Sequence, residues 1–318
     1  MAQRPALPST PEATRFVEPV VRPIVKATDL GSVQVLKQGN LFLLTDPFGD
    51  VHPDTRGLGL YEGDTRRLSC SILRINGQRP VLLQASAGGN YHGTIQLTNP
   101  RIERNLADKV RPEDALASQK VGIGRQRLLT GSVLEERVQV VNYAEEPREV
   151  ELELELAADA ADIFEVRGWV RAARGRHLPV ALRPDRVTFR YDGLDGMRRA
   201  THLEFSAPSS EAGPVNPEVA GSANAGWVRL IWRWELGTGE ARELRWTAWT
   251  TEREAPRGLD GDSPVAQGRA ARAEAEEALF PDRPLVDQDA VTASYREWNR
   301  GFAEIRTDNE LFNLAILR

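Results

Sequence analysis

Two short stretches of the sequence bring carboxylates and arginines together in patterns that could do chemistry. The first runs from residue 46 to residue 67, where acids, a histidine and arginines alternate with glycines at 49, 57, 59 and 63. Glycines allow tight turns and let a backbone approach a ligand closely. We expect this loop to contact a hydroxyl-bearing ligand or a neighbouring domain, through Asp50, Tyr61, Asp64 and Arg66. The alternative is a structural turn network between Asp64 and Arg66.

The second stretch runs from residue 159 to residue 168 and sets Asp162, Glu165 and Arg167 in a short apolar frame. These residues are predicted either to order a sheet edge beside a cleft or to form buried ion pairs that fix a turn. Buried charges need partners, and Arg167 is the expected partner. The spacing of acids does not single out an acid–base pair, and no catalytic residue is predicted in either stretch.

The sequence offers little support for a cofactor or a metal. Its four histidines, at 52, 92, 177 and 202, are scattered, and no H-x-x-x-H pair or cysteine partner accompanies them. Gly57-Leu58-Gly59 lacks the third glycine and the strand-to-helix setting of a dinucleotide loop, so it predicts a turn. We therefore expect neither a cofactor nor a metal.

Length and composition describe an ordinary globular chain. It has 318 residues, a net charge of −5 and a pI near 5.6, which argues against nucleic acid as a partner. No apolar run is long enough for a membrane helix, and the Pro-studded N-terminus lacks a signal-peptide core. The lone cysteine, Cys70, is expected in the core of a strand. A reducing, cytoplasmic setting is predicted.

Strand patterns dominate from residue 33 to residue 251. Leucines alternate with glutamates between residues 150 and 156, and a second alternation covers residues 227 to 236. Both put apolar side chains on one face of a strand, with Trp232 and Trp234 in the core, whereas Trp227 and Trp249 are better candidates for exposure. The glutamates at 151, 153 and 155 are expected on a solvated face. Asn76-Gly77 predicts a hairpin between residues 67–75 and 79–85.

Helices are expected after residue 256. Ser263-Pro264 opens an Ala/Glu/Arg-rich helix that ends near residue 280, and an apolar stripe from Val291 to Ile305 predicts a second helix. Thr307 to Glu310 forms a capping box that begins a third. The expected division is a leader over 1–30, a β domain over 31–255 and helices over 256–318, cut at the entrance to a further domain. These helices should then expose an apolar patch.

Several blocks resemble one known family. Gly39-Asn40-Leu41-Phe42-Leu43-Leu44, Asp64-Thr65-Arg66-Arg67 and Asp162-Ile163-Phe164-Glu165-Val166-Arg167-Gly168 look like the N-terminal domain of bacterial glycogen debranching enzymes (amylo-α-1,6-glucosidases). Thr307-Asp308-Asn309-Glu310-Leu311-Phe312-Asn313 resembles a further block of that family.

The resemblance implies a mainly β fold, a large antiparallel β-supersandwich, followed in full-length relatives by an α/α toroid of six helical hairpins. The catalytic carboxylates of the family are expected in that toroid. The chain would then be a non-catalytic β domain that packs on the toroid and shapes an α-glucan cleft, with α-glucan and the toroid as its partners. Two alternatives stay open: a stand-alone carbohydrate-binding or scaffold module, and a small-sugar enzyme of mutarotase type, which would need a His and a Glu facing one cavity.

Overall fold

The described part of the chain is built almost entirely of antiparallel strands. The computed structural model describes residues 33–53, 57–88, 90–100, 119–215, 226–255, 279–300 and 308. The predicted leader, residues 263–278 of the predicted first helix, and the capping box from 307 to 310 apart from residue 308 lie outside these ranges. The mainly β fold class is confirmed, and the α/α toroid is not shown in this chain.

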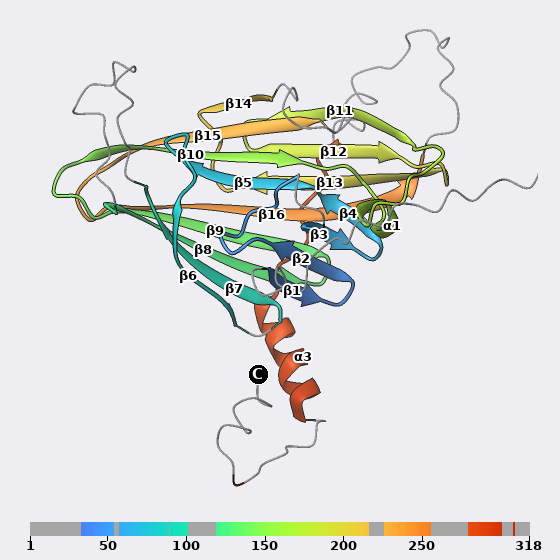
Figure 1. Cartoon of the computed structure of the whole chain (residues 1–318), viewed down its shortest axis with the longest axis horizontal. Helices are drawn as coiled ribbons and strands as arrows, with labels where there is room; N and C mark the ends of the chain where they lie inside the picture. Colours follow the sequence, from blue (N-terminus) through green and yellow to red (C-terminus); the bar gives the residue numbers. More distant parts are fainter. Residues whose placement is uncertain are drawn as a thin grey trace, which may run out of the picture.

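The strands form three antiparallel sheets (Figure 1). The first has the order β1 (Gln34–Gln38), β2 (Leu41–Thr45), β3 (Gly59–Glu62) and β4 (Thr65–Leu68). The second has the order β14 (Glu211–Pro214), β15 (Trp227–Leu236), β10 (Arg148–Ala157) and β5 (Cys70–Ile75). The third, eight-stranded sheet has the order β11 (Arg176–Arg183), β12 (Arg186–Asp192), β13 (Met197–Phe205), β16 (Ala241–Glu254), β9 (Val133–Asn142), β8 (Val121–Thr130), β7 (His92–Thr98) and β6 (Val81–Gly88).

One hydrophobic core joins the three sheets. Leu60 of the first sheet, Trp232 of the second and Trp246 of the third belong to the same cluster of buried side chains, and each is at most 1% exposed. Because the strands alternate, each sheet turns one row of apolar side chains toward this core. The predicted core positions of Trp232 and Cys70 are confirmed, since both are buried.

The outer face of the second sheet carries the glutamates of β10, and it is less exposed to solvent than the sequence predicts. Glu153 is only 4% exposed, because it lies opposite Arg74 of β5 and within 3.9 Å of Arg229 of β15. Burial raises the pKa of Glu153, and a hydrogen bond with Glu155 adds to the shift. Trp249, expected at the surface, is also buried, with 3% of its area exposed.

The Asn76-Gly77 turn forms as expected, but the hairpin does not. Both residues have positive φ, 48° and 72°, as a type I′ turn requires. The strands on either side then separate: β5 pairs with β10 in the second sheet, and β6 pairs with β7 in the third. The turn therefore passes the chain from one sheet to another, and the local signal could not show this.

The described C-terminal residues cross the third sheet. We call residues 279–300 the connector; it includes α3 (Gln288–Arg300), which confirms the predicted second helix as far as residue 300. The Leu279 carbonyl accepts a hydrogen bond from Thr188 of β12 at 2.7 Å, and Arg283 donates to Thr247 of β16 at 3.4 Å. Farther along, Tyr295 donates to the Lys37 carbonyl of β1 at 3.1 Å.

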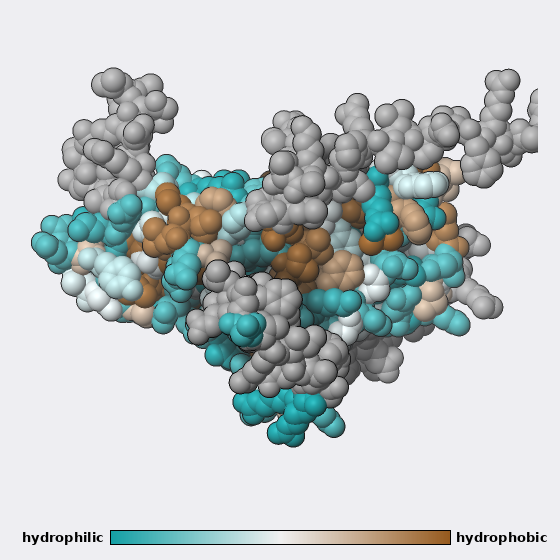
Figure 2. All heavy atoms as spheres, turned by 60° about the horizontal axis from the view of Figure 1, so that its bottom comes forward, coloured by the Kyte–Doolittle hydropathy of each residue, from teal (hydrophilic) through white to brown (hydrophobic). Residues whose placement is uncertain are grey.

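The apolar stripe of α3 is therefore at least partly covered. Val291 is buried, and the Tyr295 ring stacks on Tyr91 with 4.6 Å between ring centroids. Figure 1 shows α3 projecting at the lower end of the molecule, below β1 and β7. On the face drawn in Figure 2, the visible apolar side chains of the described residues form separate patches between hydrophilic ones.

Candidate functional site: a polar groove beside helix α1

The two stretches singled out in the sequence meet in space. The main chain of residues 64–66 runs beside residues 161–163: Arg66 donates its backbone N–H to the Ala161 carbonyl at 2.8 Å, and Ile163 donates to the Asp64 carbonyl at 2.9 Å. Thr65 and Asp162 form an isolated β-bridge. Strand β4 and the short helix α1 (Ile163–Val166) are therefore held together although about a hundred residues separate them.

Arg66 is the side chain that fastens this junction. Its guanidinium forms a two-pronged ion pair with Asp159, in which Nε lies 3.1 Å from Oδ1 and Nη2 contacts Oδ2. Although burial opposes the shift, this ion pair raises the pKa of Arg66. Gly59 leaves room for the Arg66 stem, because a Cβ at that position would lie 2.6 Å from Cδ of Arg66. The expected turn network between Asp64 and Arg66 does not form, since Asp64 is exposed and Arg66 pairs with Asp159.

Tyr61 has a packing role at the same junction. It is 2% exposed, stacks on Phe42 with 4.8 Å between ring centroids, and belongs to a small cluster with Ala161 and Val166 of the α1 region. Its hydroxyl donates to the Gly57 carbonyl at 3.1 Å. Tyr61 therefore supports the groove from beneath and does not present its ring at the surface.

Helix α1 begins with a complete capping box. The Asp162 carboxylate accepts from the N–H groups of Phe164 and Glu165, at 2.8 and 3.0 Å, and Glu165 accepts from the Asp162 N–H at 3.1 Å. These bonds satisfy backbone donors that a helix start leaves unpaired. The expected partner of the acids, Arg167, is exposed instead; Arg171 pairs with Asp162, and Arg174 pairs with Glu165 at 2.9 Å.

A groove of about 290 Å³ lies between α1 and the turn that joins β12 to β13. Its walls carry Asp162, Glu165, Arg171, Arg174, Tyr191, Asp195 and Arg199. Asp195 and Arg199 form an ion pair at 2.6 Å, which lowers the pKa of Asp195 to about 2. The groove is thus a polar surface whose charged groups are paired with one another, with one tyrosine ring among them.

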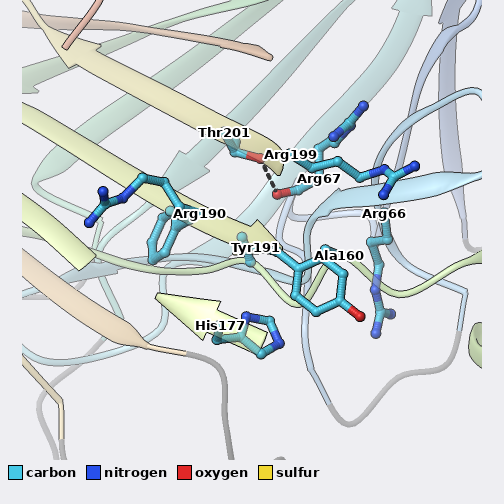
Figure 3. Close-up of a pocket in the computed structure, with 10 residues that line it drawn as sticks. Arg66, Arg67, Ala160, His177, Arg190, Tyr191, Arg199 and Thr201 are labelled. Carbon is cyan, nitrogen blue, oxygen red and sulfur yellow. Dashed lines mark hydrogen bonds between the residues drawn. The ribbon is translucent and has the colours of Figure 1, made fainter. Parts of the chain in front are cut away.

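A cavity large enough for about one water molecule adjoins the groove and shares Tyr191 and Arg199 with it (Figure 3). In Figure 3 the Tyr191 ring lies between His177 and Arg66, and the centroids of the His177 and Tyr191 rings are 4.9 Å apart. Burial, and then the charge of Arg174, lower the pKa of His177, so this imidazole is neutral at pH 7.

Apolar side chains stand exposed near the groove. Phe164 and Trp169 contact each other edge to face and are 51% and 52% exposed, and Val170 and Leu194 are more exposed still. A patch of this kind beside charged walls is typical of a surface that meets another molecule or domain.

Asp50 lies away from this groove, in a buried charge network behind the first sheet. Arg125 contacts Asp50 at 2.6 Å and Glu136 at 2.5 Å, and Arg127 contacts Glu136 at 3.0 Å. Burial would raise the pKa of Glu136, but the two arginines lower it. Gly49 has a φ of 84°, which residues with a Cβ rarely adopt, and a Cβ there would also crowd the Ile95 and Arg127 side chains, so a larger residue would strain the loop where it lies on β7 and β8. This network positions the 46–50 loop.

The described residues offer one group with metal-ligand spacing. Ligand atoms of Asp46, Asp50 and His52 lie within 4.8 Å of one another. Both carboxylates of this group already form ion pairs with arginines: Asp46 with Arg79, and Asp50 with Arg125. The positive charges beside both carboxylates oppose a cation, so we assign no metal to this group.

Most of the residues that line the groove are not among the site residues predicted from the sequence. Tyr191, Asp195 and Arg199 lie on β12, the following turn and β13, and reach the groove only because β13 pairs with both β12 and β16. The one local signal was the Asp195 to Arg199 spacing around Gly196, which is common in turns. Arg171 and Arg174 follow α1 directly and could have been proposed as partners of its acids alongside Arg167.

The strands and the groove define the chain as a β domain, and comparison with known families identifies the family of that domain. Residues 36–247 match the family described as the N-terminal domain of (some) glycogen debranching enzymes. The chain belongs to this family, which confirms the resemblance and identifies a domain associated with glycoside hydrolases. No curated protein sequence matches the chain.

Solved structures resemble the chain only distantly. A protein from the human microbiome assigned as a kojibiose phosphorylase is 10% identical, with a TM-score of 0.45; the match covers 83% of this chain and 35% of that one. A protein of Escherichia coli K12 assigned as an aldose 1-epimerase is 11% identical, with a TM-score of 0.41, over 69% and 98% of the two chains. A galactose mutarotase-like protein of Lactobacillus casei is 8% identical, with a TM-score of 0.38, over 69% and 100%.

The chain thus spans about a third of the kojibiose phosphorylase-like protein. Among the described residues, no helix combines the length and the apolar character needed to cross a membrane.

Proposed function

We propose that this chain is the non-catalytic β domain of a glycoside hydrolase that acts on α-glucans in the manner of glycogen debranching enzymes, and that the groove beside α1 forms one wall of the substrate cleft. The domain over residues 31–255, with the helices after it, would pack on an α/α toroid that carries the catalytic carboxylates. The observation that supports this most directly is that two of the blocks carrying the family resemblance, 64–67 and 162–168, join at one groove.

The state of the carboxylates supports a non-catalytic role for this groove. Glycoside hydrolysis requires a carboxylic acid that is protonated near neutral pH and a second carboxylate about 5–10 Å away. In the described walls of the groove, Asp162, Glu165 and Asp195 each pair with an arginine, and the hydrogen bond from Arg199 lowers the pKa of Asp195 to about 2, the opposite of what a general acid needs. Such groups suit hydrogen bonding to sugar hydroxyls, and Tyr191 offers a ring face beside them.

The proposal is tested by measuring glucose release from branched α-glucan. We expect none from this chain alone and substantial release when a helical catalytic domain of the family is co-expressed and forms a complex with it. The variant Tyr191→Ala should weaken glucan binding by the complex, because it removes the ring from the groove. Tyr143→Ala is the matched control, since Tyr143 is 65% exposed in the turn between β9 and β10.

Release by the chain alone would contradict the non-catalytic role. If no complex forms, or if Tyr191→Ala behaves like Tyr143→Ala, the assignment of the groove to the cleft is wrong.

The second candidate is a stand-alone carbohydrate-binding module. The exposed aromatic pair Phe164 and Trp169 near a polar groove favours it, because aromatic faces and polar groups together bind sugars. Calorimetric titration of the chain alone with maltoheptaose separates the two functions: a module binds without a partner, whereas a cleft wall binds weakly by itself.

A further inference from the structure

A second pocket lies on the other side of the third sheet from the core, beneath the beginning of α3. Its volume is about 120 Å³, and β7, β8, β9 and the connector line it. Strand register explains which side chains meet there. His92, Leu128 and Glu135 are paired across the three strands, and so are Thr94, Gln126 and Arg137. Residues paired in this way point to the same face, so six side chains from two rows share one surface.

The polar groups of this pocket are open, which distinguishes it from the groove beside α1. The side chains of Thr94, Gln126 and Gln288 make no hydrogen bond to any residue in the described part of the chain, and the buried Nδ1 atom of His92 has no partner there either. Together they offer a hydroxyl, two carboxamides and a ring nitrogen, each able to donate or accept. The floor between them is Leu128, which is apolar and 8% exposed.

The charges of the pocket balance. Arg137 donates to Glu135 at 2.9 Å, so the carboxylate and the guanidinium neutralise each other. The guanidinium of Arg127 points away from the pocket to Glu136 in the core. An anionic ligand would meet Glu135, and a cationic ligand would meet Arg137. The pocket is therefore suited to a neutral ligand that carries several hydroxyl groups.

We infer that this pocket binds a single neutral sugar ring, a monosaccharide or an equivalent cyclic polyol, with its apolar face on Leu128 and its hydroxyls on Gln126, Gln288 and Glu135. The volume supports one ring and not an oligosaccharide, since pockets for drug-sized ligands are about 300–1,000 Å³. Gln288 belongs to the connector, so the ligand would bridge the sheet and the connector. The site is separate from the groove beside α1 and does not depend on the proposed function.

The test is ligand-observed NMR on the full chain with D-glucose as the probe, and glucose 1-phosphate and maltoheptaose for comparison. We expect saturable binding of D-glucose with a dissociation constant in the range of about 1 mM, and weaker binding of the phosphate ester. Gln126→Ala and Gln288→Ala should each weaken binding several-fold. Both residues are exposed, so the variants should fold, and near-UV circular dichroism checks that they do.

Tyr143→Ala is the control variant and should leave glucose binding unchanged, because Tyr143 is exposed in the turn between β9 and β10 and lines neither this pocket nor the groove. The inference is overturned if D-glucose does not saturate below about 10 mM, if both glutamine variants bind like the unmodified chain, or if glucose 1-phosphate binds more tightly than glucose. If Tyr191→Ala abolishes glucose binding and the two glutamine variants do not weaken it, glucose binds in the groove beside α1, and the inference is equally overturned.

Discussion

The imidazole of His202 is a buried titratable group that lies between two threonine hydroxyls. It is 2% exposed, its Nδ1 lies 3.1 Å from the Thr188 hydroxyl, and its Nε2 lies 2.9 Å from the Thr251 hydroxyl. Thr188 uses its only proton on the Leu279 carbonyl, so it must accept from Nδ1–H. In the neutral ring, Nε2 then accepts from Thr251. A protonated Nε2 could instead donate to the same hydroxyl, so burial and the nearby charges, and not these bonds, decide the charge of His202.

Protonation of His202 should therefore cost stability. Burial lowers its pKa from 6.5 to about 4, and the nearby positive charges of Arg253 and Arg190 also lower it. The unfolded chain binds this proton at a higher pH than the folded chain does. The contribution is fully present above about pH 6.5, is lost as pH falls toward 4, and amounts to roughly 3 kcal/mol at most.

We expect His202→Gln to flatten the pH dependence of the free energy of unfolding between pH 6.5 and pH 4, measured by urea denaturation. Carboxylates titrate in both proteins, so the difference between the two curves isolates the histidine. Parallel curves would show that folding does not lower the pKa of His202.

At the scale of elements, the network around Arg125 ties four segments together. Its guanidinium on β8 contacts Glu136 on β9, Asp50 and the Phe48 carbonyl in the loop after β2. Asp50 in turn accepts from the Leu73 N–H of β5 at 3.2 Å. The loop is thereby fixed on the third sheet by buried charges, with its backbone in contact with β8.

Arg125→Met should leave Asp50 and Glu136 as buried charges that have lost a partner, which typically costs about 3–5 kcal/mol. Arg148→Met is the control, since Arg148 pairs with the exposed Glu146 and such pairs contribute about 1 kcal/mol or less. Urea unfolding measures both. Similar midpoints for the two variants would show that the buried network is not what holds the loop.

Local patterns in the sequence predicted the strands and the helix better than they predicted which strands become neighbours. The alternation from residue 150 to residue 156 and the 227–236 strand follow from period-two burial, and α3 follows from its apolar spacing. The exchange of partners after Asn76-Gly77 and the burial of Glu153 and Trp249 depend on which strands become neighbours. For the same reason, only some of the residues that line the groove could be predicted. Asp162 and Glu165 lie in one short motif, whereas Tyr191 and Arg199 belong to strands that are distant in the sequence.

On the scale of the whole molecule, the connector attaches the last described residues to the eight-stranded sheet. It contacts β12 through Leu279, β16 through Arg283 and the β1 region through Tyr295. Residues 279–300, which the sequence assigned to a helical region beyond the β domain, thus pack against that domain. The domain boundary at residue 255 stays a prediction, and these contacts show that the segment after it is not independent of the sheets.

Thr188→Val should loosen the connector, because it removes the donor to the Leu279 carbonyl and the acceptor for His202. A lost hydrogen bond of about 1 kcal/mol would raise the open population about fivefold. We expect trypsin to cut after Arg296, in α3, correspondingly faster. Thr238→Val, in the exposed turn between β15 and β16, should leave the rate unchanged. Equal cleavage rates in the two variants would rule out a holding role for Thr188.

The position of β16 has a consequence for how the protein is made. This strand is the last of the eight in the chain, yet it lies between β13 and β9 in the sheet order. During synthesis on the ribosome, the β6–β9 and β11–β13 groups are complete before residue 254 is added. Until then β9 and β13 are edge strands without the partner that β16 later provides. Open edges of this kind pair readily with other chains. The nascent chain is therefore most exposed to aggregation in the interval just before β16 emerges, and chaperone binding should matter most there.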